Sequence, residues 1–457
     1  MRSGLGELSP AEQRLWDAFP RGETVAPHED TPHVVRAAVI RSLLLGGRDA
    51  EPGHRPALRL HGAEVVGVLD LYQAEIEHAV EFVGCVFDAT PQLSFAQLRG
   101  MSFEGSTLPG LDAFGAVVQG TLSLVKCVLS DAVVVYGLQV SGDLDLDWAR
   151  LASGGRAEDV FGDRTAALFG DALHVGRHLY LQGTTAAGNV ELAGVRIGGT
   201  LHAQRGCRID GELRLPGAQV AGEVDLSHAV LVNPGGVALD ARGLRVGQLT
   251  LLAERVEGTV DLRHSQTEVL RDEPDRWPAR LRLDGARYAA LERAGTSRER
   301  LCWLNRDPDG YRPQPYEQLA ALYRQIGQDS DARAVLLAKQ RRRRRLLPPA
   351  AAAWGLAQDG LVGYGYRPGR ALLWLSVLAV LGATVFSGYP PVAAPGGTDF
   401  NPLVYTLDLL IPIVQFGQEQ TYRTEGPAQW LAYLLMAIGW LLFTAVAAAL
   451  TRTLNRF

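Results

Sequence analysis

Residues 188–226 read GNVELAGVRIGGTLHAQRGCRIDGELRLPGAQVAGEVDL, and this stretch repeats itself. A glycine is followed by an alternating apolar triplet at Gly188, Gly199, Gly211 and Gly222. The apolar residues recur about every eleven residues, for example at Val190 and Leu201. Self-similarity at a short fixed period is typical of repeat architectures. The same motif occurs elsewhere at Gly67, Gly120, Gly142, Gly247 and Gly258.

A second, shorter motif lies between these triplets, as Gly194-Val-Arg-Ile197, Gly217-Ala-Gln-Val220 and Gly243-Leu-Arg-Val246. Each step therefore holds two very short strands with alternating apolar residues. Asn-Gly and Asp-Gly hairpin turns are almost absent between the strands, while glycine stands at regular corners, where a tight bend needs positive φ or lacks room for a Cβ. We therefore expect a mainly β fold, a right-handed parallel β-solenoid of the quadrilateral β-helix type. About 22 residues, two steps, would form one four-sided coil.

The residues between the apolar positions of each triplet are expected to face solvent. Their charges are mixed, which favours an ordinary solvated face; a binding surface for an unknown protein partner is the alternative. The segment 148–164 breaks the repeat and is predicted to be a loop inserted at a coil corner. The outward residues are Ser123, Asp145, Glu191, His202, Arg214, Asp225, Thr250 and Asp261.

The segments on either side of the repeat are expected to be helical. Ser9-Pro-Ala-Glu12 predicts a capped helix that runs to Phe19, and Thr31 is expected to open a second helix that ends near Leu45. Beyond the repeat, residues 316–326 and 329–344 predict a helical hairpin separated by Gly327. The expected domains are an N-terminal helical cap at 1–56, the β-solenoid at 57–290, a helical connector with a polybasic segment at 291–365, and a transmembrane domain at 366–457.

Two uncharged segments near the C-terminus, Ala371–Phe386 and Trp430–Leu450, are each expected to cross a bilayer. A bilayer core of about 30 Å needs about 20 apolar residues. Basic residues are concentrated outside the loop between the two spans, so the positive-inside rule predicts a multi-pass protein of the cell inner or plasma membrane, with the termini and the solenoid in the cytoplasm. The residues expected at the membrane surface are Arg341, Arg342, Arg343, Arg344, Arg345, Arg367 and Arg370.

Between the two spans, residues 400–417 read FNPLVYTLDLLIPIVQFG. This segment is too apolar for a free loop and too short to span, so it is expected to lie in the interface or to re-enter the membrane. A pore-like element is the alternative, and it would require a homo-oligomer because one two-span hairpin cannot enclose a pore. The pore candidates are Asp408, Gln415, Gly417 and Gln418.

Composition excludes several classes of function. The net charge of −5 argues against a nucleic-acid partner. The four cysteines form no CxxC pair and match no zinc spacing, so reduced and mostly buried thiols are expected. Dinucleotide-binding, Walker, GxSxG and HExxH motifs are missing from the sequence. We therefore predict no catalytic residue, no metal and no cofactor, and favour a protein that is not an enzyme.

The corner-and-leucine pattern resembles pentapeptide-repeat and related quadrilateral β-helix proteins, although its step is closer to five plus six residues than to five plus five. Six further stretches resemble a family of actinobacterial membrane proteins in which a degenerate repeat precedes two spans, and the similarity covers nearly the whole chain. Members of that family are often labelled membrane-associated oxidoreductases, which would imply redox activity, but no cofactor motif here supports that label. The matching stretches are 315–319, 333–336, 339–341, 363–368, 407–412 and 439–440.

The sequence thus favours a membrane-tethered β-solenoid that presents a cytoplasmic binding or scaffolding surface, with the lipid bilayer and an unknown protein as partners. A channel-like or transport-associated protein that uses residues 400–417 is one alternative. A membrane-associated oxidoreductase is the other, and it rests on the family label alone.

Overall fold

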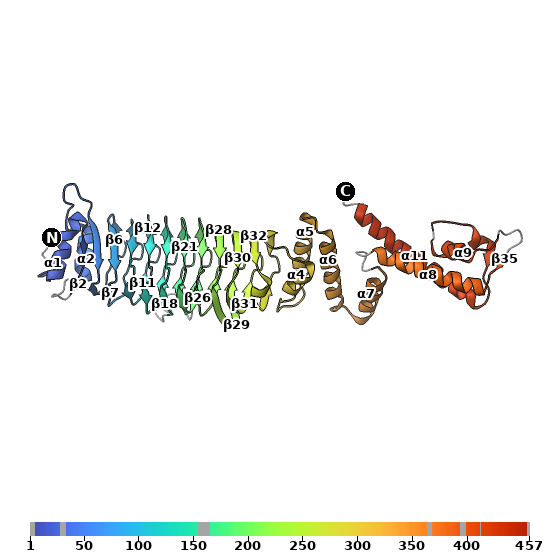
Figure 1. The fold of residues 1–457 in the computed structure, drawn as a ribbon. Coiled ribbons are helices and arrows are strands. Elements are labelled where there is room, and N and C mark those ends of the chain that lie inside the picture. The colour runs from blue at the N-terminus through green and yellow to red at the C-terminus, as the bar shows by residue number, and fades with distance from the viewer. Residues whose placement is uncertain are drawn as a thin grey trace. The chain divides into compact units, whose positions relative to one another are not determined.

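The computed structural model describes residues 5–27, 33–153, 165–362, 368–393, 399–411 and 413–454. The chain divides into two compact units, Met1–Gln318 and Leu319–Phe457. The first unit is a parallel β-solenoid of about 10 turns, drawn from blue to yellow in Figure 1. The second unit is helical.

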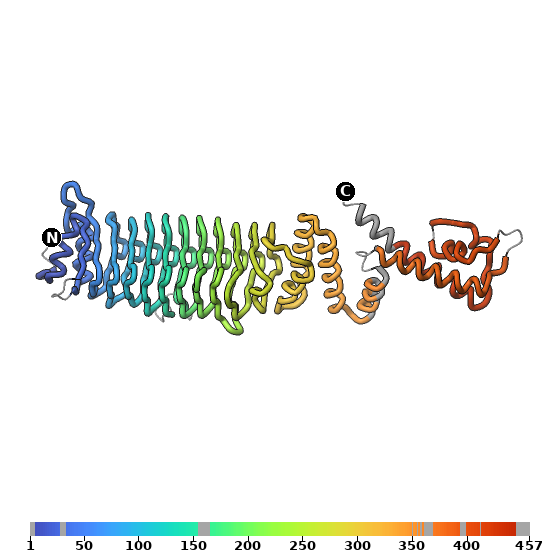
Figure 2. The backbone as a smooth tube through the Cα atoms, in the orientation of Figure 1, coloured from blue at the N-terminus to red at the C-terminus, as the bar shows by residue number. Residues whose placement is uncertain are grey.

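Each coil of the solenoid contributes four short strands, and equivalent strands of successive coils pair in parallel. One coil consists of β12 (Val117–Val118), β13 (Leu122–Ser123), β14 (Val128–Leu129) and β15 (Val133–Val134). The strands of the next coil pair with these in turn: β16 (Gln139–Val140), β17 (Leu144–Asp145), β18 (Arg150–Ala152) and β19 (Ala166–Phe169). We call the stacks through β12, β13, β14 and β15 ladders 1, 2, 3 and 4. The predicted four-sided parallel solenoid is confirmed, and Figure 2 shows its coils stacked one on another.

The remaining strands extend these ladders in both directions. Ladder 1 contains β5 (Glu75–Ile76), β8 (Gln97–Leu98), β20 (His174–Val175) and β24 (Arg196–Ile197). Ladder 2 contains β1 (Thr24–Val25), β3 (Ala57–His61), β6 (Ala79–Val83), β9 (Met101–Ser102), β21 (Leu179–Tyr180) and β25 (Leu201–His202). Ladder 3 contains β2 (Val34–Arg36), β4 (Glu64–Val66), β7 (Val86–Phe87), β10 (Thr107–Leu108), β22 (Thr185–Ala187) and β26 (Arg208–Ile209). Ladder 4 contains β11 (Leu111–Asp112), β23 (Asn189–Glu191), β27 (Leu213–Arg214) and β33 (Arg280–Arg282).

In the last coils, single longer strands serve two adjacent ladders. Ladders 1 and 2 share β28 (Gln219–Asp225), β30 (Arg245–Leu251), β32 (Gln266–Asp272) and β34 (Arg287–Leu291). Ladders 3 and 4 share β29 (Val230–Asp240) and β31 (Arg255–Asp261).

The core is a stack of aliphatic side chains in register. Leu201 pairs with Val224 in ladder 2, and Val224 pairs with Leu249. The intervening triplet, which contains Leu213, lies in ladder 4 instead. The eleven-residue step therefore places successive triplets on alternate ladders. The stacked residues Leu122, Leu144, Leu179, Leu201, Val224 and Leu249 are all at most 1% exposed.

The two glycine motifs fit the corners for different reasons. Gly217, from the shorter motif, has φ of +67°, a conformation that costs other residues strain. At Gly222, from the triplet motif, a Cβ would lie 2.9 Å from the carbonyl oxygen of Gly199 in the adjacent coil. The first type of glycine supplies the bend, and the second allows adjacent coils to approach.

The N-terminal cap confirms one expected helix and corrects the other. Helix α1 (Pro10–Ala18) has the predicted capping box between Ser9 and Glu12, and the short helix η1 (Phe19–Arg21) follows it. The second helix does not begin as expected: residues 28–32 lie outside the described residues, and Val34–Arg36 form β2, which pairs with β4. Helix α2 covers only Ala37–Ser42 and continues into the turn η2 (Leu43–Gly47). Residues Val34–Arg36 form a strand and not a helix because the first coil would otherwise present an open strand edge.

The last coil is closed by a second cap that the sequence analysis missed. It contains η4 (Pro274–Arg276) and α4 (Ser297–Leu304), whose capping box is formed by Thr296 and Glu299. The carboxylate of Asp272 accepts hydrogen bonds from Arg300 and from the indole of Trp277, at 2.8 Å each. Asp272 and Arg300 are each 2% exposed. A buried and bonded ion pair thus fixes α4 to the end of the solenoid.

The second unit contains the predicted hairpin and two long apolar helices at the positions of the predicted spans. The hairpin begins at the boundary of the first unit with α5 (Pro313–Gln325) and continues with α6 (Asp329–Arg344). Helix α7 (Pro349–Val362) was not predicted. It is followed by α8 (Pro368–Gly388), α9 (Pro402–Leu410), α10 (Gln418–Thr421) and α11 (Pro427–Leu454), and by a strand pair, β35 (Val392–Ala393) and β36 (Tyr422–Arg423). Helices α8 and α11 are long and apolar enough to cross a membrane, with mean hydropathy of 2.0 and 1.3 over their best windows.

The C-terminal cap can be tested with Asp272→Asn. The substitution keeps the shape of the side chain but leaves the Arg300 charge buried without a counter-charge, so the free energy of unfolding should fall by about 3–5 kcal/mol. Thermal unfolding followed by tryptophan fluorescence measures this, because Trp277 and Trp303 flank Arg300. The control is Glu257→Gln, which breaks the exposed Arg255–Glu257 pair and should change stability by less than about 1 kcal/mol. Equal effects of the two substitutions would contradict the role of the buried pair.

Candidate functional site: a basic groove on ladder 1

A groove of about 1000 Å³ follows ladder 1 across successive coils. Its floor is formed by aliphatic residues that also belong to the core: Val140, Val175, Ile197, Val220 and Val246. The corner beside the floor carries small residues, which leave the surface hollow there: Ser141, Gly176, Gly198, Ala221 and Gly247.

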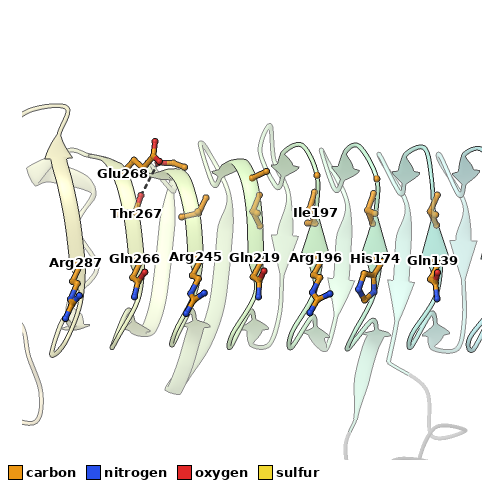
Figure 3. Close-up of a pocket in the computed structure, with 18 of the residues that line it drawn as sticks. Gln139, His174, Arg196, Ile197, Gln219, Arg245, Gln266, Thr267, Glu268 and Arg287 are labelled. Carbon is orange, nitrogen blue, oxygen red and sulfur yellow. Dashed lines mark hydrogen bonds between the residues drawn. The ribbon is translucent and has the colours of Figure 1, made fainter.

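One side of the groove is a row of polar side chains in strict register (Figure 3). Parallel pairing places equivalent residues of successive coils beside one another, with a spacing of about 4.8 Å. Arginine alternates with glutamine in the second half of the row, so neighbouring arginines are two coils apart. The row consists of Gln139, His174, Arg196, Gln219, Arg245, Gln266 and Arg287.

The charges of this row are not neutralised. Among the described residues, Arg196, Arg245 and Arg287 form no ion pair. The residue two positions after each is small and uncharged: Gly198, Gly247 and Ala289. Glu268 is the one acidic side chain among the described residues that line the groove, and Figure 3 shows it on the side away from the row. The groove therefore presents net positive charge.

Ladder 3 shows the opposite arrangement with similar residues. Arg208 pairs with Asp210 at 2.6 Å, and Arg255 pairs with Glu257. In both cases the partner lies two positions further along the same chain, where ladder 1 has a small residue. Arg208 and Arg255 are thus neutralised within their own coils.

The expected row of solvated residues is wrong in part, because it combines two ladders. Ser123, Asp145, His202, Asp225 and Thr250 lie on ladder 2, while Glu191, Arg214 and Asp261 lie on ladder 4. Glu191 and Asp261 are buried and paired with arginine: Arg214 lies 2.6 Å from Glu191, and Arg263 lies 2.6 Å from Asp261. Burial raises the pKa of Asp240 on the same ladder, but hydrogen bonds from Arg242 outweigh this effect and the net pKa is lowered. Ladder 4 is thus held together by ion pairs.

The groove could not be predicted from the outward residues of the longer motif, because those residues lie on ladders 2 and 4. The signal was present in the shorter motif, where a polar residue precedes the last apolar residue of each copy. Those residues are Arg196, Gln219 and Arg245.

In the second unit, some of the predicted membrane-surface arginines are bonded to Asp359, and others form no ion pair among the described residues. Arg341 donates two hydrogen bonds to the carboxylate of Asp359 on α7, at 2.8 and 2.9 Å, and Arg344 lies 3.2 Å from it. Hydrogen bonds from Arg341 therefore lower the pKa of Asp359, although burial opposes them. Arg370 donates to the Asp359 backbone carbonyl at 3.1 Å, and Arg367 lies outside the described residues. Among the described residues, Arg342, Arg343 and Arg345 form no ion pair, so these three side chains are the ones available to lipid headgroups.

The apolar segment between the spans contains α9, which packs against both α8 and α11. Two glycines allow this close approach. A Cβ at Gly382 on α8 would lie 2.3 Å from the Thr406 methyl group, and a Cβ at Gly439 on α11 would lie 2.4 Å from the Leu410 carbonyl oxygen. Thr406 and Leu435 both lie beside the Cβ position of Gly382, and Leu435 is one helical turn before Gly439. Helix α9 therefore runs parallel to α11.

The pore-candidate residues fold the chain back after α9. The Asp408 carboxylate accepts hydrogen bonds from the backbone N–H groups of Phe416 and Glu419, at 2.8 Å each. The Gln418 side chain accepts from the Asn401 N–H at 3.3 Å and donates to the Asp399 carbonyl at 3.1 Å. Gly417 has φ of +83°, and Gln415 is exposed. A role for these residues in a pore stays a prediction.

Other reactive groups give no further site. Among the described residues, no group of three or more histidine, cysteine or acidic side chains is arranged to hold a metal ion. Burial raises the pKa of Cys127 and Cys207 to about 12, so both thiols are protonated near neutral pH. Cys85 is also buried, but Cys302 is exposed.

Comparisons with protein-family models, with curated proteins and with solved structures found no match. The family resemblance drawn from the sequence therefore stays a prediction. The groove and the apolar helices carry the functional inference.

The packing of α9 can be tested with Gly439→Ala. The added methyl group meets the Leu410 carbonyl oxygen, and overpacking of this kind costs about 1–3 kcal/mol. The thermal stability of the detergent-solubilised protein, measured by fluorescence-detected gel filtration after heating, should fall. Gly369→Ala is the matched control, since nothing lies within 4 Å of its Cβ position. A stability loss in the control alone, or in both variants, would contradict the docking of α9 at Gly439.

Proposed function

We propose that the chain is a membrane-tethered scaffold whose β-solenoid holds a protein partner in the basic groove of ladder 1. The observation that carries this proposal is the row of arginines that have no counter-charge, beside a hollow lined by small and aliphatic residues. On ladder 3, Arg208 and Arg255 have acidic partners within their own coils. Among the described residues, the arginines of the ladder 1 row have no such partner, which supports a counter-charge supplied by another molecule.

The tether is formed by α8 and α11. Both helices expose large aliphatic side chains, such as Leu373 and Val380 at 64% and 63%, as expected of surfaces that face lipid. The proposed orientation places both termini and the solenoid in the cytoplasm, at the inner or plasma membrane. It is supported by the excess of basic residues outside the inter-span loop. Arg342, Arg343 and Arg345 would contact anionic headgroups there.

In this arrangement α9 is a re-entrant helix. Nine residues span only about 13.5 Å, less than half of a bilayer core of about 30 Å. Leu410, at the end of α9, lies beside Gly439, which is twelve residues after the start of α11. At about 1.5 Å per residue, this places the end of α9 about 18 Å along α11. Such a depth supports re-entry rather than a position in the interface.

The re-entrant geometry is also the observation that favours the channel-like alternative, which needs several copies around a common axis. Against it, the Asp408 carboxylate is occupied by two backbone N–H groups. For the oxidoreductase alternative, the described residues offer neither a cluster that could hold a metal ion nor a disulfide.

The tether predicts the behaviour of a truncated protein. Full-length protein should remain in the membrane pellet after an alkaline carbonate wash, while the protein without residues 366–457 should become soluble. The truncated chain keeps Arg341–Arg345, so a salt wash is needed to remove peripheral binding. A full-length protein released by carbonate would refute the tether.

The groove predicts site-specific contacts in intact membranes. A photoreactive benzoylphenylalanine in place of Gln219 on ladder 1 should give a cross-linked adduct, while the same residue in place of Val230 on ladder 3 should not. Replacing Arg196, Arg245 and Arg287 with glutamine in the full-length chain should abolish the adduct at position 219. Adducts that are equal at both positions, or that survive the triple substitution, would contradict a charged docking groove.

A further inference from the structure

We propose that the ligand of the groove is a peptide segment in the polyproline II conformation, with an acidic side chain at every third residue. This inference rests on the proposed function and adds the chemistry and conformation of the partner. It follows from the spacing of the arginines, from the glutamines between them, and from the contrast with ladder 3.

The spacing selects the conformation of the ligand. Arg196, Arg245 and Arg287 are separated by two coils each, which at about 4.8 Å per coil is about 9.6 Å. Polyproline II has three residues per turn and rises about 3.1 Å per residue, so side chains at every third position lie on one face about 9.3 Å apart. In a β-strand, side chains on one face are about 6.6 Å or 13 Å apart. Of these two conformations, polyproline II is the one whose side-chain spacing matches that of the arginines.

The glutamines match the backbone of such a ligand. Gln219 and Gln266 lie between the arginines of the row, and a glutamine amide both donates and accepts hydrogen bonds. A polyproline II backbone has no internal hydrogen bonds, so its carbonyl groups are free to accept. The aliphatic floor and the small corner residues leave room for the residues between the acids, for which proline is suited because it is already fixed in this conformation.

The composition of the groove favours a peptide over a nucleic acid. Single-stranded nucleic acids are bound by stacking of their bases on aromatic side chains, together with a positively charged groove. Among the described residues that line this groove, His174 and Tyr288 carry the aromatic rings, and they lie at different coils. A phosphate backbone also offers acceptors only, which a continuous row of arginine or lysine would suit better than alternation with glutamine.

Ladder 3 provides a matched control on the same molecule. Arg150, Arg208 and Arg255 are also two coils apart. Asp210 and Glu257 neutralise two of them. The spacing alone therefore exists on both ladders, and only ladder 1 combines it with free charge and a groove.

The test is the binding of fluorescent peptides to full-length protein in detergent, measured by anisotropy at low ionic strength. A peptide of Glu-Pro-Pro repeats should bind at least about tenfold more tightly than a peptide of the same composition with glutamates at every second position followed by a proline block. Binding should be lost with Arg196→Gln, Arg245→Gln and Arg287→Gln combined. It should persist with Arg208→Gln and Arg255→Gln combined.

Several results would overturn the proposal. Equal affinity for the two peptides would show that the protein recognises the charge of the peptide and not the spacing of its glutamates. Binding that survives the ladder 1 substitutions would show that the peptide binds outside the groove. Tighter binding of a single-stranded RNA of equal charge would favour the nucleic acid instead. If adducts at position 219 persist in membranes while the Glu-Pro-Pro peptide fails to bind, the ligand chemistry is wrong and the scaffold stands. If both fail, the groove is not a docking site.

Discussion

Parallel pairing between successive coils is the constraint on which the solenoid depends. Each coil hydrogen-bonds to the next at a fixed spacing, so a residue on one coil lies beside its equivalent on the next. The corners must let adjacent backbones approach, which is why Gly222 has no room for a Cβ. The two ends must be closed, because an open coil presents unpaired strand edges. Strand β2 with α1 closes one end, and α4, fixed by the Asp272–Arg300 pair, closes the other.

The same constraint turns a short sequence motif into a surface pattern. A charge that recurs in register becomes a line of charge, and its neighbours decide whether that line is neutral. On ladder 4, the buried carboxylates of Glu191 and Asp261 are paired with the partly exposed Arg214 and Arg263. On ladder 3, Arg208 and Arg255 are paired within their coils, whereas on ladder 1 a glycine or alanine stands where the partner would be. The groove thus arises from small residues as much as from arginines.

The sequence was sufficient to predict the coil length, the four-sided parallel solenoid, the α1 capping box and the two apolar spans, since each depends on local periodicity or composition. It was insufficient wherever the structure depends on contacts between residues that are far apart in the sequence. Residues Val34–Arg36 form a strand because they pair with the edge of β4. Arg341 on α6 donates a hydrogen bond to Asp359 on α7. The ladder 1 row was readable in principle, since Arg196, Gln219 and Arg245 occupy one position of the shorter motif. Their alignment became evident only once the register was known.

The corner between ladders 3 and 4 has absorbed changes in chain length. The chain between β18 and β19 runs from Ala152 to Ala166, whereas the equivalent corner between β14 and β15 runs only from Leu129 to Val133. Strand β29 carries a second insertion at the same corner, between Val232 and Val237. Neither insertion changes the register of ladder 1, since Gln139 still pairs with His174 and Gln219 with Arg245. Chain length can therefore vary at this corner while ladder 1 keeps its spacing.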